Sequence, residues 1–371
     1  MTRFRILATV MSVFAVVSPV RGEETKLAVP GLEQRVDFWK KVFTQYGKDD
    51  LIIHDGFYVN LIYGSASQSD VKSKMAEVRD ALRELRDTLD TPEARSPFAR
   101  QIAEDIAAQG LPVSTVSLNT LIDNLHSQQG VKERFRDGVV RSGRYVEEFR
   151  QIVKNAGVPE ELALLPLVES SFENVRSKAG AVGIWQFMRG TGRQYLKIAN
   201  NVDERLDPSK AATAAARMLR DNYNALGEWP LAVTAYNHGR GGMLHAKEQH
   251  GADLVSIIND YRGPVFGYAS MNFYSEFLAA VEVYKNYPQF FGDLALDQPQ
   301  SKAVPVKLAS VKTTPPAPKA TPAAIADKYK VKAGDSLWVV AQRFGTSIRS
   351  LMELNNLKES AIYAGQILLV K

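Results

Sequence analysis

The stretch ELALLPLVESSFENVRSKAGAVGIWQFM, residues 161–188, places one glutamate, Glu169, near the end of an apolar run. Its spacing from Leu162, Leu165 and Phe172 puts its carboxyl on the apolar face of a helix, because residues three or four apart share a helical face. An ionised carboxylate is costly to bury unless it is paired or its pKa rises. These residues alone leave two interpretations open. Glu169 forms a structural ion pair, for example with an arginine of the N-terminal half, or it is a general acid that holds a proton near neutral pH.

The end of this stretch, SKAGAVGIWQFM (177–188), carries residue types suited to a sugar ligand. Its small residues let a backbone and a substrate approach closely. Trp185, Gln186 and Phe187 follow them, and an aromatic ring beside an amide is a usual sugar-contacting pair. The alternative for these three residues is plain packing in the core.

A third segment, LAVTAYNHGRGGM (231–243), is a predicted helix that ends at Tyr236 and Asn237 before a glycine-rich exit. A tyrosine hydroxyl and an asparagine amide at a helix end can orient a carboxyl and a bound sugar. Asn237 and Gly239 also suit a C-terminal cap, and the two roles are compatible.

Periodicity predicts helices over most of the body of the chain. The segments with helical spacing are 69–90, 131–157, 206–227 and 272–288. The third of them has Asp207 as its predicted cap and Gly227 as its stop signal. Pro166 lies inside the predicted helix of the opening stretch and should kink it. Residues 51–64 are a possible pair of short strands.

Composition and charge exclude several classes of protein. The chain has no cysteine, which excludes disulfides, thiolate metal sites and a lipid anchor attached to a cysteine. Between residues 23 and 296 there are 32 Lys and Arg against 36 Asp and Glu, whereas a nucleic-acid-binding protein carries a basic surface. His238 and His245 are seven residues apart, but glycines separate them, so we expect no metal site and no cofactor.

The N-terminus has the pattern of a secretory signal peptide. Arg3 and Arg5 precede an apolar run over residues 6–17, and residues 20–22 are an acceptable cleavage site. The alternative is an uncleaved membrane anchor, but the apolar run is short for a membrane span. We therefore expect export to the periplasm without a lipid anchor.

Taken together, these motifs resemble the catalytic domain of lytic transglycosylases with the goose-type lysozyme fold, in particular the membrane-bound lytic murein transglycosylase D group. The motifs are ES at 169–170, GIWQFM from residue 183 and AYN at 235–237. DERLDPSKAATAAARML and FYSEFLAAVEVY are also similar to that family, so the resemblance covers roughly residues 140–290. It implies a mainly α fold with a lysozyme-like α-helical catalytic domain.

The resemblance also implies roles for the residues of these motifs. Glu169 would be the sole catalytic acid and base for the bond between N-acetylmuramic acid and N-acetylglucosamine, giving a 1,6-anhydro product. Its neighbour Ser170 matches the family serine. Gln186 matches the family's substrate-contacting glutamine, and Tyr236 and Asn237 match a Tyr-Asn pair that helps to position Glu169. Together with the aromatic residues beside Gln186, the predicted substrate-binding residues are Ser170, Trp185, Gln186, Phe187, Tyr236 and Asn237.

Hydrolytic glycosidases usually place a second carboxylate across the scissile bond. The candidates near Glu169 in sequence are Glu173, Asp203, Glu204 and Asp207. Glu173 leans toward solvent in the pattern and Asp207 is explained as a cap, so the sequence requires no second catalytic carboxylate. This favours a transglycosylase over a lysozyme-like muramidase. A catalytically inactive peptidoglycan-binding scaffold is the alternative from another class.

The C-terminal segment YKVKAGDSLWVVAQRFGTSIRSLMELNN and IYAGQILLV resembles a LysM domain, a small α+β (βααβ) unit. Such domains bind glycans that contain N-acetylglucosamine, and the alternative is a small structural cap. The resemblance implies that the glycan-binding residues are Gly334, Asp335, Ser336, Leu337, Ile362, Tyr363 and Ala364. A proline-rich stretch before it has the composition of an extended linker.

The predicted organisation has five parts. They are a signal peptide (1–22), a helical N-terminal region (23–139), the transglycosylase catalytic domain (140–296), a Pro-rich linker (297–327) and the LysM domain (328–371). The expected partners are peptidoglycan glycan strands, and no nucleic acid.

Overall fold

The structure is a computed structural model that describes residues 27–263, 265–299, 328–331, 340, 344, 348–357 and 365–370. It divides into two compact units, Met1–Lys302 and Ala303–Lys371, and each is described by itself. The predicted signal peptide and nearly all of the predicted linker lie outside the described residues. Within the described part of the chain, no helix has the length and apolarity needed to cross a membrane.

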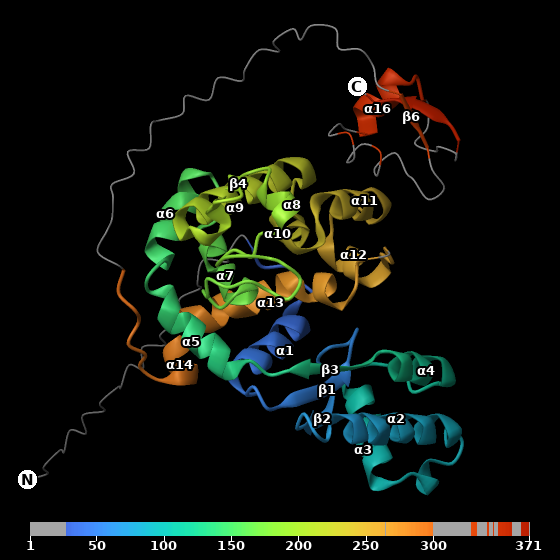
Figure 1. Cartoon of the computed structure of the whole chain (residues 1–371). Coiled ribbons are helices and arrows are strands. Elements are labelled where there is room, and N and C mark those ends of the chain that lie inside the picture. Colours follow the sequence, from blue (N-terminus) through green and yellow to red (C-terminus); the bar gives the residue numbers. More distant parts are fainter. Residues whose placement is uncertain are drawn as a thin grey trace, which may run out of the picture. The chain divides into compact units, whose positions relative to one another are not determined.

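The first unit is built mainly from helices (Figure 1). Its α-helices are α1 (Glu33–Thr44), α2 (Val71–Asp87), α3 (Pro97–Ala108), α4 (Thr115–Asp123), α5 (Lys132–Ser142), α6 (Val146–Asn155), α7 (Pro166–Glu169), α8 (Arg189–Gly192), α9 (Pro208–Leu226), α10 (Trp229–His238), α11 (Arg240–His250), α12 (Leu254–Asp260), α13 (Tyr268–Lys285) and α14 (Tyr287–Phe291). Its 3₁₀ helices are η1 (Pro92–Ala94), η2 (Glu160–Leu164) and η3 (Glu204–Leu206). Its strands are β1 (Leu51–Asp55), β2 (Ile62–Ala66), β3 (Leu125–Gln129), β4 (Ile198–Ala199) and β5 (Val202–Asp203).

The N-terminal part of this unit contains an antiparallel sheet in the order β2-β1-β3. The pair of strands predicted within residues 51–64 is confirmed, with Leu51 opposite Ala66. The sequence did not predict the third strand, β3, which pairs with β1 along its whole length. The LHSQQ sequence of β3 has no apolar alternation, so periodicity gives no strand signal there. Helices α2, α3 and α4 pack together beside this sheet and share an apolar core with it (Figure 1).

The remaining helices share one large apolar core. Helix α1 packs along α13, and α9 packs against α6 and α10. The prediction for α9 is confirmed: the Asp207 side chain accepts a hydrogen bond from the Lys210 amide, and Gly227 ends the helix at φ 81°. The alanines in the first half of α9 are buried, and their small side chains let neighbouring helices approach closely; they are Ala211, Ala212, Ala214, Ala215 and Ala216.

Helix α13 is fixed between this helical core and the N-terminal sheet. The buried Arg35 of α1 donates to the Asn272 Oδ1 on α13 (2.9 Å) and to the Phe57 carbonyl after β1 (2.8 Å). At the start of α13 the Tyr268 hydroxyl donates to Gln128 Oε1 on β3 (3.3 Å). These bonds hold the helix that lies next to the candidate site.

The second unit contains β6 (Lys328–Lys330), α16 (Ile348–Leu354) and β7 (Ile367–Leu369). The two strands pair antiparallel, as expected for the first and last elements of a βααβ unit. The Asn355 side chain joins helix to strand, because it donates to the Leu351 and Leu369 carbonyls and accepts from the Leu369 amide. The small core of this unit contains Val331, Val340, Leu351, Leu368 and Val370.

Candidate active site

Glu169 is the last residue of the short helix α7. The run before it is not one helix but two, since η2 is a 3₁₀ helix and α7 begins at Pro166. Proline suits the first position of a helix, and the kink expected at Pro166 is therefore realised as a junction between two helices. Leu162, Leu165 and Phe172 are buried as the helical spacing predicts, and Glu169 lies at the border of that apolar face.

The carboxyl of Glu169 has no hydrogen bond or ion pair within the described part of the chain, and its side chain is partly exposed. Burial among apolar neighbours raises its pKa to about 8. The structural ion pair that the sequence left open is not formed. Arg141 of α5 binds in this region, but its partners are the Ser171 carbonyl (2.9 Å) and the Glu173 carboxylate (3.1 Å). Glu169 is thus a carboxyl that holds its proton at neutral pH and is free to transfer it.

The turn after Glu169 is strained and firmly held. Ser171 and Phe172 have left-handed backbones, with φ of 52° and 57°, which are unusual for residues with side chains. Arg141 Nε donates to the Ser171 carbonyl (2.9 Å). Ser170 is fully buried, and its hydroxyl donates to the Ile184 carbonyl (2.7 Å). Ser170 therefore does not reach a substrate directly; it ties the glutamate turn to the segment that begins at residue 183.

Tyr236 on α10 lies near Glu169. Burial and the negative charge of Glu169 raise the pKa of Tyr236 well above its ordinary value, so the phenol stays protonated. Its hydroxyl donates to the Trp185 carbonyl (2.8 Å) and makes no hydrogen bond with Glu169. Ser270 of α13 donates to Asn237 Oδ1 (3.1 Å), and the Asn237 side chain is otherwise exposed.

The rings of Trp185 and Phe187 are not available to stack on a sugar. Trp185 is fully buried against Phe149, with ring centroids 5.3 Å apart, and Phe187 is 2% exposed. Gln186 between them is partly exposed and left-handed at φ 48°. Its amide nitrogen donates to the Gly183 carbonyl (2.7 Å) and the Val175 carbonyl (3.2 Å), which leaves its amide oxygen for a ligand. Of the three residues, plain packing explains the two aromatic ones.

A buried arginine anchors this turn. Arg205 is 1% exposed and binds both carboxylate oxygens of Asp203, at 2.8 and 2.7 Å, while its third nitrogen donates to the Phe187 carbonyl (3.1 Å). Gly183 has φ 87°, and a Cβ there would overlap the Arg205 carbonyl. Glycine is therefore required where the turn crosses η3. No feature of the sequence alone marked Arg205 as part of the site.

The four carboxylates near Glu169 in sequence all have structural partners. Besides the pairs of Glu173 and Asp203, Glu204 binds Lys210 (2.9 Å), and Asp207 caps α9. The structure instead places another carboxyl close to Glu169, that of Glu276 on α13. Sequence reasoning missed it because Glu276 is more than a hundred residues away and lies in an ordinary amphipathic helix.

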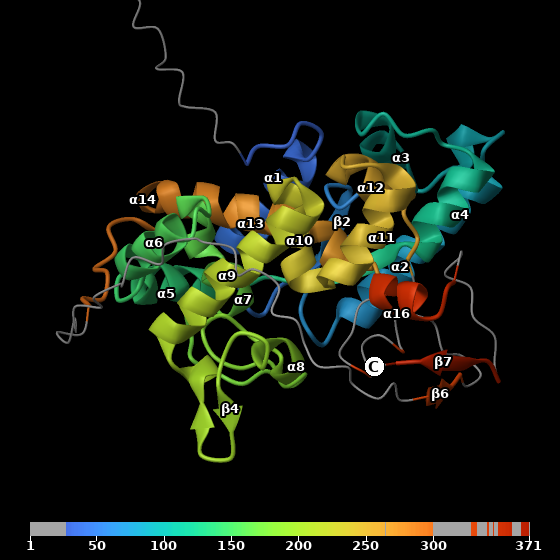
Figure 2. The ribbon, with the colours of Figure 1, turned by 90° about the horizontal axis from the view of Figure 1, so that it is seen from above.

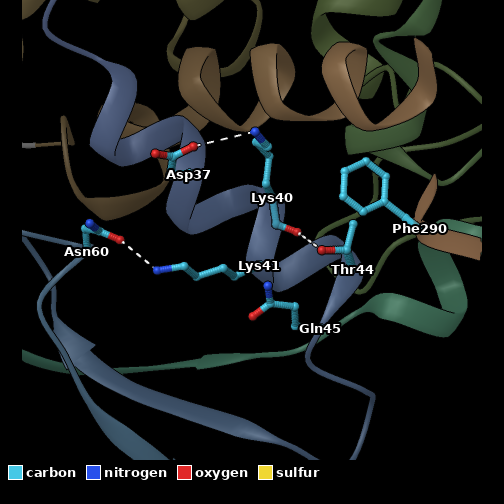
Figure 3. A pocket seen from close by; sticks show the side chains of 7 residues that line it. All are labelled: Asp37, Lys40, Lys41, Thr44, Gln45, Asn60 and Phe290. Carbon is cyan, nitrogen blue, oxygen red and sulfur yellow. Dashed lines mark hydrogen bonds and ion pairs between the residues drawn. The ribbon is translucent and has the colours of Figure 1, made fainter. Parts of the chain in front are cut away.

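A cavity of about 230 Å³ lies elsewhere, against α1 (Figure 3). It is lined by Asp37, Lys40, Lys41, Thr44, Gln45, Asn60 and Phe290. Its cations are already engaged, since Lys40 binds Glu282 (2.6 Å) and Lys41 donates to Asn60 (3.3 Å). It contains none of the predicted site residues and is separate from the candidate active site.

The seven residues predicted to bind glycan in the second unit cannot be placed. Gly334, Asp335, Ser336, Leu337, Ile362, Tyr363 and Ala364 all lie outside the described residues.

Comparison with known protein families agrees with the motifs. Residues 148–258 match the family model of the transglycosylase SLT domain, and residues 329–371 match that of the LysM domain. The chain carries an SLT domain and a LysM domain. Glu169, Gln186, Tyr236 and Asn237 all lie within the SLT domain, whereas Glu276 lies after its matched end.

The chain is similar to membrane-bound lytic murein transglycosylase D of Escherichia coli, with the same values for strains K12 and CFT073. The identity is 42% over 118 residues, which are 31% of this chain and 26% of the relative. The chain thus spans about a quarter of the length of these relatives. A solved structure of lytic transglycosylase Slt from Pseudomonas aeruginosa matches with a TM-score of 0.32 and 15% identity, over 60% of this chain and 37% of that one.

Proposed function

We propose that this protein is a lytic transglycosylase of peptidoglycan. It would cleave the β-1,4 bond between N-acetylmuramic acid and N-acetylglucosamine and form a 1,6-anhydro end on the muramic acid. The observation that carries the proposal is the state of Glu169: an unpaired carboxyl in an SLT domain, with its pKa raised to about 8 by burial. A neutral carboxyl in an apolar setting is the usual form of a glycosidic general acid.

The chemistry needs one carboxyl used twice. Protonated Glu169 gives its proton to the glycosidic oxygen, and the bond between that oxygen and C1 of the muramic acid breaks. The resulting carboxylate then takes the proton of the C6 hydroxyl of the same sugar, whose oxygen closes on C1. Glu169 ends with its proton restored, and no water enters the product.

The other carboxyls around Glu169 support this route over hydrolysis. A hydrolase needs a second, ionised carboxylate as nucleophile or as base for water. The four carboxylates near Glu169 in sequence are committed to structural partners. The remaining neighbour, Glu276, has its pKa raised to about 8, so it is neutral at neutral pH and cannot take either role.

The surrounding residues would divide the work of binding and positioning. Gln186 offers its amide oxygen, and Asn237 its exposed amide, to the sugar. Tyr236 would fix the turn beside Glu169 through its bond to the Trp185 carbonyl. Ser170, Trp185 and Phe187 would act from inside the core and not by contact with substrate.

We further propose that the LysM domain holds the enzyme on peptidoglycan glycan strands through the seven residues named above. A tethered binding module raises the effective concentration of the enzyme at its polymer. The N-terminal pattern of residues 1–22 supports export, and we place the protein in the periplasm, at the cell wall.

The mass of the products tests the proposal. Purified sacculi are digested with the full-length protein, and the released muropeptides are analysed by mass spectrometry. We expect 1,6-anhydro ends, which are lighter than the products of hydrolysis by one water molecule. Reducing ends in their place would identify a muramidase, and binding to sacculi without any release would identify an inactive scaffold.

A further inference from the structure

Glu276 is a second carboxyl beside Glu169, and no step proposed above uses it. It lies near the middle of α13. Helix α7, which ends at Glu169, packs on α13 (Figure 1), and Figure 2 shows the same helices from above. Its neighbours in sequence, Ser275 and Phe277, are fully buried, and Glu276 itself is partly exposed. The carboxyl therefore lies at the border of the core, where α13 meets α7.

No cation neutralises Glu276 within the part of the chain that the structure describes. The titratable groups that contact α13 from the helices packed against it include Arg35 and Lys40 of α1, Glu161 of η2 and His238 of α10. The group whose charge acts on Glu276 is Glu169 of α7, and Tyr236 of α10 lies near Glu169. Both cations are engaged elsewhere on α13, Arg35 with Asn272 (2.9 Å) and Lys40 with Glu282 (2.6 Å). On α13 itself, Tyr268 feels the charge of Glu276 but is a phenol with a raised pKa. The charged neighbour that acts on Glu276 is therefore another carboxyl, that of Glu169.

The two carboxyls are electrostatically coupled. Burial raises the pKa of both to about 8, and for Glu276 the negative charge of Glu169 adds to the effect of burial. Two carboxyls that repel each other when both are ionised lose their protons in two separate steps. Between these steps the pair keeps one proton, and part of the population carries it on Glu169.

We propose that Glu276 is a positioning residue that shares a proton with Glu169. The pair then still supplies an acid at pH values at which a lone Glu169 would be ionised. This inference rests on the proposed function, because it concerns the same general acid. Repulsion from ionised Glu276 delays the loss of the last proton, which extends activity toward alkaline pH. Below the first ionisation both groups are neutral, and Glu276 has little effect on the rate.

Substitution of Glu276 by glutamine tests the inference, because glutamine keeps the shape and removes the titration. The release of anhydro-muropeptides is measured across the pH range for the wild type, for Glu276→Gln and for Glu282→Gln. Glu282 is the matched control: it lies on the same helix, is exposed and pairs with Lys40 (2.6 Å). We expect Glu276→Gln to move the alkaline limb of the pH–rate profile to a pH about one unit lower. The rate at acidic pH should stay within about threefold of the wild-type rate. The control should follow the wild type.

An unshifted alkaline limb in Glu276→Gln would overturn the inference. If that variant is inactive or unfolded, the carboxyl of Glu169 is followed in the wild type by ¹³C NMR. Ionisation in two separate steps supports proton sharing, and a single step overturns it. This titration needs no turnover. If the wild type releases no anhydro product, the proposed function is refuted. The NMR titration then still tests whether the two carboxyls share a proton.

Discussion

Replacement of Glu169 by glutamine is expected to lower the release of anhydro-muropeptides by about a thousand-fold or more. Glutamine keeps the size of the side chain but can neither give a proton to the glycosidic oxygen nor take one from the C6 hydroxyl. Both halves of the proposed reaction therefore fail together. The measurement is the initial rate of sacculus digestion by the purified full-length protein.

Stability separates a chemical effect of this substitution from unfolding. Because the folded pKa of Glu169 is raised from 4.5 to about 8, its contribution to stability is full at low pH and is lost as pH rises toward 8. Glutamine cannot ionise, so Glu169→Gln should be at least as stable as the wild type at pH 8. Glu173→Gln, which removes a nearby carboxylate paired with Arg141, should keep most of the activity. A Glu169→Gln protein that digests sacculi at the wild-type rate would refute the proposed mechanism.

Replacement of Arg205 by methionine is expected to lower the free energy of unfolding by about 3 kcal/mol. The guanidinium is 1% exposed, and its removal leaves the Asp203 carboxylate and the Phe187 carbonyl without their partner. The value is at the lower end for a broken buried pair because the Asp203 side chain is 21% exposed. Urea unfolding followed by circular dichroism measures the change.

An exposed arginine provides the control for that experiment. Arg189 on α8 is at the surface, and Arg189→Met should change the free energy of unfolding by less than about 0.5 kcal/mol. Arg205→Met should also lose activity at temperatures where it is still folded, because the turn of residues 183–187 carries the carbonyl that holds Tyr236. If the two variants unfold alike, Arg205 does not anchor the turn.

Local patterns in the sequence predicted the elements that are defined by local rules. Helix α9 was predictable because Asp207, Pro208 and Gly227 are start and stop signals with a direct physical basis. The apolar spacing placed Glu169 on the buried face of a helix, and in the structure Glu169 is partly exposed at the border of that face. The ordered motifs indicated the family of the central domain, and the SLT match agrees.

The rest depends on contacts between segments that are distant in sequence. Strand β3 is held by its pairing with β1 and not by its own polar residues, so its sequence gives no sign of a strand. Trp185 is buried because Phe149 packs on it. The sequence shows only an aromatic residue beside a glutamine and does not reveal this packing. Glu276 meets Glu169 only because α13 lies against α7. Each of these needs the tertiary structure.

The central claim is that the fold keeps a proton on Glu169 at neutral pH. The most direct test is a ¹³C NMR titration of the Glu169 carboxyl in the intact protein, with its signal assigned by comparison with Glu169→Gln. We predict that Glu169 ionises with a midpoint of about 8. A midpoint near 4.5, the value of an ordinary glutamate, would contradict the account.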